Sequence, residues 1–294
     1  MRRSLKYIVF AGTTVLSGSL LYTGTRRNDF GTLYAAADVT AADFLRSGLT
    51  QERKAWNKNW DFRDTNRTRT KSSDRSHIPS LSEYTSGTDE QKPGLERSSA
   101  TRHLVFIRHG QYVKADEDKD KILTQCGRKQ AEETGKRLKL LHTNQKIDKL
   151  VISTMTRAKE TGGIIQKFLP NVPYEYCDFL REGAPCVPEP VSSSWKAEDY
   201  DVFQESARIE AAFRKHIHRA DPEQKTDSIE VYVCHANVIR YFICRALQFP
   251  TEGWLRMSIG NCGITWLTIR PNGHVSLRNM GDVGHLHPDL ITRS

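Results

Sequence analysis

An apolar run that ends in charged residues is the feature that most constrains this chain. Residues 104–107 are Leu, Val, Phe and Ile, and Arg108, His109 and Gly110 follow directly. Such a run favours a short buried strand of an α/β sheet. Ligands of open α/β sheets bind beyond the carboxyl ends of the strands, which is where Arg108 and His109 would lie. Gly110 would let the backbone turn tightly and approach an anion, although an ordinary strand end is also compatible with this triplet.

Further strand ends of this kind recur along the chain. Residues 150–153 form an apolar strand that leads to Arg157, residues 180–183 contain Glu182, and residues 229–234 form a strand that precedes His235. Thr124 is placed to cap the start of a helix. Helices are expected near residues 124–141, 156–168, 206–219 and 237–247, and a hairpin is expected over residues 264–278. This alternation predicts a three-layer α/β/α fold whose mostly parallel sheet has antiparallel pairing at one edge.

Two arginines, two histidines and one glutamate at strand ends suit phosphoryl transfer. Arg108 and Arg157 can bind a phosphoryl group bidentately, and His109 is the candidate nucleophile. Two neighbouring arginines should keep that imidazole neutral. Glu182 can protonate the leaving group and then activate water, while His235 is a further donor. The alternatives are structural histidines, surface arginines and a solvated glutamate.

These residues resemble the histidine phosphatase superfamily, also called the phosphoglycerate mutase-like family, from about residue 102 onward. The longer motifs at residues 180–185, 206–213, 234–241, 244–250 and 252–256 narrow the resemblance to its mitochondrial serine/threonine protein phosphatases. The resemblance implies a phosphoglycerate mutase-like fold and a phosphohistidine intermediate without a metal or other cofactor. It also implies that Arg108, Arg157, His235 and Gly110 bind the phosphate.

The substrate class has three interpretations. The resemblance implies phosphorylated Ser/Thr proteins, such as stress-activated (MAP) kinase kinase kinases. A small-molecule phosphatase or mutase is the second interpretation, but mutases carry a long insertion after the acid-bearing loop, whereas residues 183–200 form a short connection here. The third is a membrane scaffold with incidental catalysis, for which a lost catalytic residue would be expected, and none is missing.

The first 97 residues are expected to lie outside the catalytic domain. Residues 1–6 are basic, and residues 7–24 lack charged side chains, so they form a marginal transmembrane anchor, with a secretory signal peptide as the alternative. Residues 25–97 are expected to be a disordered linker and residues 98–294 the phosphatase domain. The resemblance implies a single-pass protein of a mitochondrial membrane, with the outer membrane favoured.

A tryptophan motif at residues 56–61 interrupts the linker. Exposed aromatic side chains in polar sequence often mark a docking segment. The motif resembles the multimerisation segment of the same family, which packs against a neighbouring catalytic domain and promotes activity. Trp56, Asn59, Trp60 and Asp61 are therefore expected to mediate self-association, although Asn57 stands where the family commonly has aspartate. The alternative is that both tryptophans pack on their own domain.

Charge and cysteine content exclude some functions. The net charge of +9 is spread over the chain without a concentrated basic stripe, so nucleic-acid binding is not expected. None of the six cysteines forms a pair with two-residue spacing, and a reduced, cytosol-facing domain is the default. His285 and His287 have no further candidate ligands near them, so no metal site is expected.

Overall fold

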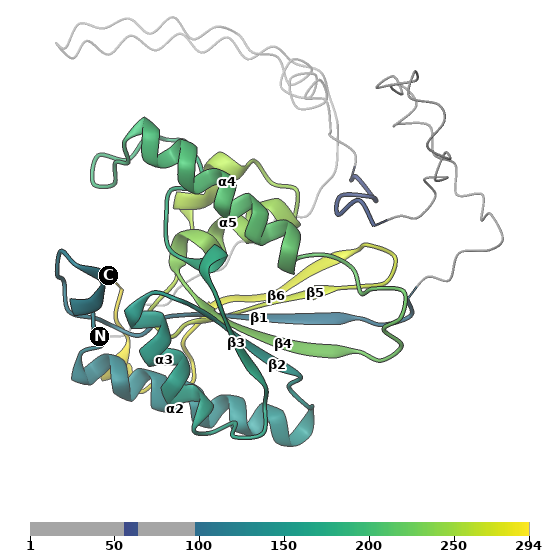
Figure 1. The fold of residues 1–294 in the computed structure, drawn as a ribbon, viewed down its shortest axis with the longest axis horizontal. Helices are drawn as coiled ribbons and strands as arrows, with labels where there is room; N and C mark the ends of the chain where they lie inside the picture. The colour runs from purple at the N-terminus through teal and green to yellow at the C-terminus, as the bar shows by residue number, and fades with distance from the viewer. Residues whose placement is uncertain (1–55, 64–97, 294) are drawn as a thin grey trace, which may run out of the picture. The chain divides into compact units, whose positions relative to one another are not determined.

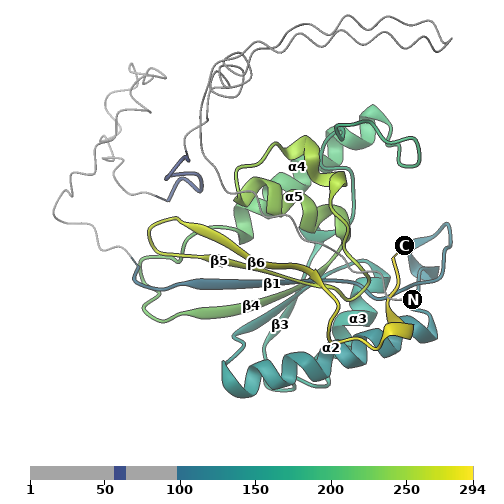
Figure 2. The same cartoon turned by 180° about the vertical axis from the view of Figure 1, so that it is seen from behind.

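The computed structural model describes residues 56–63 and 98–293. The expected anchor at residues 7–24 and most of the expected linker lie outside the described residues. The described chain forms a mixed sheet covered by helices on both faces (Figures 1 and 2). This arrangement confirms the mostly parallel α/β/α fold.

The sheet has six strands in the order β3-β2-β4-β1-β5-β6 among the described residues. The strands are β1 (Arg102–Arg108), β2 (Lys149–Ser153), β3 (Tyr174–Cys177), β4 (Ser228–Cys234), β5 (Ile264–Ile269) and β6 (Val275–Asp282). Strands β1 to β4 pair in parallel, whereas β5 pairs antiparallel with both β1 and β6. The last two strands form the expected hairpin at one edge. The carboxyl ends of β1 and β4 therefore lie side by side.

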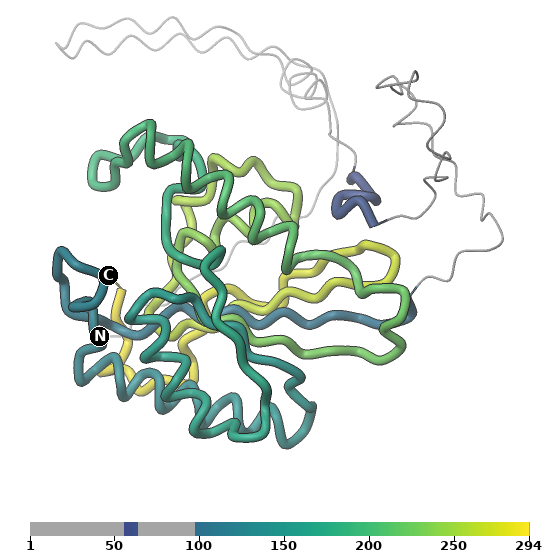
Figure 3. Tube along the Cα trace, viewed as in Figure 1, coloured from purple at the N-terminus to yellow at the C-terminus, as the bar shows by residue number. Residues whose placement is uncertain are grey.

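Two helical layers enclose the sheet. The α-helices are α2 (Gln125–Asn144), α3 (Thr156–Gln166), α4 (Asp199–His216) and α5 (Ala236–Ala246). Short 3-10 helices are η2 (Asp118–Asp120), η3 (Asp178–Leu180), η4 (Thr251–Arg256) and η5 (Pro288–Leu290). The path of the chain alternates between strand and helix through most of the domain (Figure 3).

Side chains of β1 alternate between the two layers because successive residues of a strand face opposite sides. Leu104 and Phe106 pack in the cluster that contains α4 and α5, while Val105 and Ile107 pack in the cluster that contains α2 and α3. All four side chains are fully buried. A strand buried on both faces explains the continuous apolar run in the sequence.

Helix boundaries follow local capping. The Thr124 side chain accepts a hydrogen bond from Gly127 N, which confirms Thr124 as the N-cap of α2. Helix α4 begins at Asp199, seven residues before the expected start, and ends at His216 rather than near residue 219. Its first turn carries Asp199 and Asp201, which suit a helix N-terminus, but Tyr200 and Phe203 are exposed. The buried-face periodicity that predicts a helix is therefore absent from this turn.

Candidate active site

Two histidines meet at the carboxyl ends of β1 and β4. His109 follows β1 and His235 follows β4, and their ring centroids lie 5.1 Å apart. The register pairs Arg108 with Cys234, and His109 N donates to Cys234 O at 3.0 Å. Both imidazoles are almost completely buried. The parallel pairing of two distant segments thus creates the centre of the site.

Hydrogen bonds fix the tautomer of His109. Arg157 Nε donates to His109 Nε2 at 3.2 Å, so Nε2 carries a lone pair. The ring proton therefore lies on Nδ1, which donates to Gly110 O at 2.8 Å. Burial lowers the pKa of His109 well below its ordinary value, and the charges of Arg157 and Arg108 lower it further. His109 is a neutral imidazole whose Nε2 can act as a nucleophile.

His235 has a hydrogen-bond partner at the end of β2 that was not predicted. Its Nε2 lies 2.8 Å from the hydroxyl of Ser153 at the end of β2. No hydrogen-bond partner for its buried Nδ1 is found in the described part of the chain. Burial, then the neighbouring His109, Arg157 and Arg108, lowers the pKa of His235 well below its usual range. If Ser153 donates to Nε2, then Nδ1 carries the proton and can donate to a phosphoryl oxygen.

Both predicted arginines are buried beside these histidines. Arg157 lies in the first turn of α3, and its Nη1 is 3.5 Å from a carboxylate oxygen of Asp118. The guanidinium of Arg157 also lies 4.8 Å from the centroid of the Tyr112 ring. Arg108 donates from Nη1 to Ile259 O at 2.7 Å. These contacts hold two planar cations around His109, which is the arrangement that phosphate binding requires.

Glu182 reaches the same site from the loop after η3. Burial raises the pKa of its carboxyl group, while Arg157, Arg108 and Arg240 act in the opposite direction. Arg208 of α4 holds the backbone of this loop, because its guanidinium donates to Arg181 O at 2.6 Å and to Glu182 O at 2.9 Å. A partly buried carboxyl group with a raised pKa is suited to donate a proton.

The structure thus brings together His109, His235, Arg108, Arg157 and Glu182, which come from four separate segments. Sequence reasoning missed Ser153, Asp118 and Arg240 as neighbours of the site. Arg208, Asn237 and Arg240 stand within the motifs that carry the family resemblance, but no role was predicted for them. A polar residue directly after the apolar run of β2 was the available signal for Ser153.

Gly110 is placed by close backbone contact. Its N–H donates to the Thr161 hydroxyl at 3.0 Å. A Cβ atom on Gly110 would lie 2.7 Å from Gly127 O, and one on Gly127 would lie 2.0 Å from Gln111 O. The two glycines therefore let the loop after β1 lie directly on the first turn of α2. Whether Gly110 also contacts phosphate stays a prediction.

Residues before β5 fix the backbone of His109, the candidate nucleophile. Cys262 N donates to Arg108 O at 3.0 Å, and Asn261 Nδ2 donates to His109 O at 3.2 Å. Asn261 in turn is bonded to Thr292, whose hydroxyl donates to Asn261 Oδ1 at 2.9 Å. The segment before β5 is thus a support for His109.

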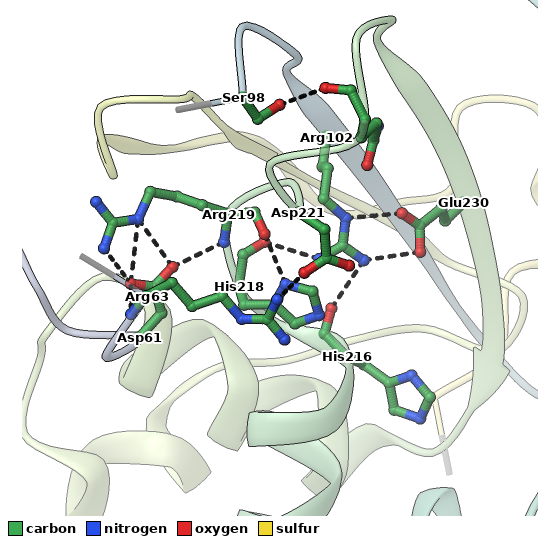
Figure 4. A network of polar contacts seen from close by, with 10 residues as sticks. Asp61, Arg63, Ser98, Arg102, His216, His218, Arg219, Asp221 and Glu230 are labelled. Carbon is green, nitrogen blue, oxygen red and sulfur yellow. Dashed lines mark hydrogen bonds and ion pairs between the residues drawn. The ribbon is translucent and has the colours of Figure 1, made fainter. Parts of the chain in front are cut away.

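The tryptophan motif lies against the catalytic domain in this single chain. The Trp60 indole is buried, donates to Gly273 O at 2.8 Å and lies 5.9 Å from the Phe213 ring. Asp61 accepts hydrogen bonds from Arg219 N at 2.8 Å and Arg219 Nη2 at 2.6 Å (Figure 4). Trp56 is more exposed, with its ring centroid 6.2 Å from that of His274. Asn59 Oδ1 also accepts from Arg219, at 3.0 Å.

Asn57 forms the turn of this motif. Its side-chain oxygen accepts a hydrogen bond from Asn59 N at 2.9 Å, and its backbone exchanges two hydrogen bonds of 2.9 Å with the Gln248 side chain. A carboxylate at position 57 could accept the same turn hydrogen bond. The amide is therefore compatible with the turn that an aspartate would form.

A buried ion pair lies beyond the motif, at the amino ends of β1 and β4. Arg102 donates from Nε and Nη2 to the Glu230 carboxylate at 2.8 Å each, and its Nη1 donates to His218 O at 2.7 Å (Figure 4). Burial by itself would raise the pKa of Glu230, but the hydrogen bonds and charge of Arg102 lower it to about 2. Arg102 begins the strand that His109 follows, so this pair lies at the other end of β1 from the active site.

Fold and site together place two histidines and two arginines at the carboxyl ends of a mostly parallel sheet, as expected for a histidine phosphatase. The family model for the histidine phosphatase superfamily (branch 1) matches residues 104–282. The chain belongs to this superfamily. It is 51% identical over 243 residues to the Caenorhabditis briggsae protein named serine/threonine-protein phosphatase Pgam5, mitochondrial. The matched region covers 82% of this chain and 81% of the relative.

Vertebrate proteins of the same name are similarly related. Identity to the Mus musculus protein is 50%, over 84% of each chain, and identity to the Homo sapiens protein is 54%, over 71% of this chain and 73% of the relative. Among solved structures, phosphoglycerate mutase from Plasmodium falciparum is 36% identical, covers 64% of this chain and 96% of its own, and has a TM-score of 0.47.

Two features are absent from residues 56–63 and 98–293. Within these ranges, no group of three or more His, Cys, Asp or Glu side chains is arranged to hold a metal ion. Nor does any helix in them have the length and apolar character needed to cross a membrane.

Proposed function

We propose that this chain is a metal-independent serine/threonine protein phosphatase that acts through a phosphohistidine on His109. One observation carries the proposal: the Nε2 lone pair of His109 faces Arg157, while Nδ1 is tied to Gly110 O. A neutral imidazole held between guanidinium groups combines a nucleophile with cations that stabilise the equatorial phosphoryl oxygens. The names of the relatives support the phosphoprotein substrate.

The proposed reaction has two displacements. His109 Nε2 attacks phosphorus, the bond from phosphorus to the ester oxygen breaks, and Glu182 gives its proton to that oxygen. A water molecule then attacks phosphorus and loses a proton to Glu182, and the bond from phosphorus to His109 breaks. Inorganic phosphate leaves, and both residues regain their starting protonation states. Arg108, Arg157 and His235 hold the phosphoryl oxygens in both steps.

A protein substrate suits the connection after Glu182. Residues 183–198 contain no helix or strand before α4 begins at Asp199. A short connection without such elements supports a site that admits a phosphorylated loop, with stress-activated (MAP) kinase kinase kinases as candidate substrates. A small-molecule phosphatase or mutase is the alternative, and a membrane scaffold with incidental catalysis is the third.

Phosphate release by the purified full chain tests these functions. We expect turnover of a phosphothreonine peptide, formation of an acid-labile phosphoenzyme, and loss of both in the His109→Ala variant. Retention of activity within about tenfold in that variant would refute the nucleophile assignment. Turnover of 3-phosphoglycerate but not of the peptide would favour the metabolic function, and turnover of neither would favour the scaffold.

We also propose a mitochondrial membrane location and self-association. The word mitochondrial in the relatives' names supports the location, and residues 7–24 are the proposed single-pass anchor, with the outer membrane favoured. Trp60 and Asp61 fill a site on a catalytic domain, so the same contacts could form between two copies of the chain. Size-exclusion chromatography with and without residues 51–64 tests this, and an equal number of subunits in both forms would contradict it.

A further inference from the structure

A hydrogen-bond chain links Arg240 to the loop that carries Glu182. Arg240 lies on α5, and its Nη1 donates to Asn237 Oδ1 at 3.2 Å. Asn237 Nδ2 in turn donates to Gly183 O at 3.1 Å. Residues three apart on a helix share a face, which explains how both side chains reach the same loop. The guanidinium of Arg240 is thereby connected to the residue directly after Glu182.

One donor of Arg240 is buried without use in the described part of the chain. Its Nε atom is shielded from solvent and has no hydrogen-bond partner there. The charge of Arg240 nevertheless acts on both Glu182 and Arg108. A buried guanidinium donor without a partner is unfavourable, and such groups often have a functional reason. A carboxylate that forms nearby during the reaction would provide that partner.

We propose that Arg240 is a positioning residue for Glu182. This proposal rests on the proposed phosphatase function. Through Asn237 it fixes the backbone beside the acid. After Glu182 has given its proton to the leaving oxygen, Arg240 Nε–H donates a hydrogen bond to the resulting carboxylate. When Glu182 regains a proton from the attacking water, this hydrogen bond is released. Arg240 itself neither gains nor loses a proton.

The charged and titratable groups around Glu182 come from every neighbouring element. They are Arg108 from β1, Arg157 from α3, Glu205 and Arg208 from α4, Cys234 from β4 and Arg240 from α5. Burial raises the pKa of Glu182, and Arg240 is one of the cations that lower it. Removal of Arg240 should therefore raise the pKa of Glu182 further. In a variant without Arg240, the alkaline limb of the pH profile of kcat/KM should therefore move to higher pH.

The test compares leaving groups. In the full chain, Arg240→Gln should lower kcat/KM for a phosphothreonine peptide by about tenfold or more, because an alkoxide leaving group needs the acid. For p-nitrophenyl phosphate, whose leaving group needs little protonation, the loss should stay within about threefold. This retained activity also shows that the variant folds. Arg278→Gln on β6, where Arg278 lies over the Trp266 ring, is the matched control and should change neither value.

A second comparison shows whether Arg240 acts through Glu182. In a Glu182→Gln background, adding Arg240→Gln should change kcat/KM for the peptide by less than about threefold, because residues that act as one unit are not additive. Equal losses on both substrates, additive losses in the double variant, or an unmoved alkaline limb would each overturn the proposal. If the wild-type chain hydrolyses only 3-phosphoglycerate, the protein-phosphatase function fails, but that alkyl ester replaces the peptide in the same comparison.

Discussion

Arg157 Nε and His109 Nε2 face each other across 3.2 Å, so the cation and the nucleophilic lone pair share one hydrogen bond. A phosphoryl group that binds here would replace this hydrogen bond with contacts from Arg157 to its oxygens. The lone pair would then be directed at phosphorus. The arginine that holds the imidazole before binding is thus also the group placed to stabilise the transition state.

Arg157→Lys should therefore lower kcat/KM for a phosphothreonine peptide by about 100-fold. Lysine keeps the charge, but it lacks both the Nε–H that bonds His109 and the planar fork that binds phosphate bidentately. Steady-state kinetics of the full chain provide the measurement, with Lys159→Arg on the outer side of the same helix as the control. A loss below about threefold would show that charge alone is sufficient.

The pH profile should show a histidine that does not titrate near its ordinary pKa. His109 must be neutral and Glu182 protonated in the free enzyme. Because burial lowers the pKa of His109 and raises that of Glu182, kcat/KM should fall at low pH only well below 6.5, and should fall at high pH as Glu182 loses its proton. In Glu182→Gln the alkaline limb should disappear at a lower overall rate. Since substrate ionisation is common to both proteins, an identical alkaline limb would contradict the acid role.

Acid should destabilise the fold through buried neutral histidines. Burial lowers the pKa of His216 to about 3 and that of His218 to about 4, from 6.5 in the unfolded chain. The unfolded state therefore binds more protons below pH 6.5, and stability is lost as the pH falls from 6.5 toward 3. Each histidine contributes a slope of about 1.4 kcal/mol per pH unit within its window. Because the pKa of Glu230 is lowered from 4.5 to about 2, its contribution to stability is lost as the pH falls between these values.

Urea denaturation at pH 7, 6, 5 and 4.5 measures this slope. We expect the free energy of unfolding to decrease steadily, by an amount that corresponds to the uptake of at least two protons near pH 5. An unchanged free energy of unfolding between pH 7 and pH 5 would show that these histidines are protonated in the folded protein.

Gly127 and Gly163 have contrasting surroundings, so substitution by alanine should have opposite effects on stability at the two positions. Gly127→Ala should destabilise the domain by about 2 kcal/mol or more and reduce activity, because the new Cβ would meet the backbone of Gln111 at 2.0 Å. Gly163→Ala in α3 meets no atom within 4 Å and should stabilise the domain by about 0.5–1 kcal/mol. Thermal unfolding and peptide turnover of both variants provide the measurement. A neutral Gly127→Ala would mean that the loop after β1 can move away from α2.

The two tryptophans should differ in their importance for docking. Trp60→Ala removes a buried indole and its hydrogen bond to Gly273, so tryptic cleavage after Arg63 should accelerate by about tenfold or more. Trp56→Ala removes a side chain that is 38% exposed and should accelerate cleavage less. The loss of domain stability in either variant should be limited, because residues 56–63 can leave their site without unfolding the domain. Equal cleavage rates in both variants would contradict this ranking.

Much of the framework could be predicted because strong local signals coincide. Apolar runs predicted β1, β2 and β4, and capping by Thr124 predicted the start of α2. In contrast, the early start of α4 was missed because Tyr200 and Phe203 are exposed and give no buried-face pattern. Strand β3 was also not predicted as such, since Tyr174 and Tyr176 are exposed at the edge of the sheet.

The residues of the candidate site also divide into those that could be predicted from the sequence and those that could not. Residues directly after apolar runs, such as His109 and His235, could be proposed from position and chemistry. Ser153 had the same positional signal, but its hydrogen bond to His235 depends on strand register. Asp118 and Arg240 could not be proposed, because their neighbours depend on how a loop and a helix pack. A single polar residue carries no periodic signal of such contacts.

The support of His109 by Asn261 and Cys262 has a consequence for biosynthesis. These residues lie about 150 positions after the nucleophile, so the ribosome adds them when most of the domain has already been made. A nascent or prematurely terminated chain that stops before them lacks the hydrogen bonds that hold the His109 carbonyl. The hydrogen bonds that hold the backbone of His109 can therefore form only after residue 262 has been synthesised.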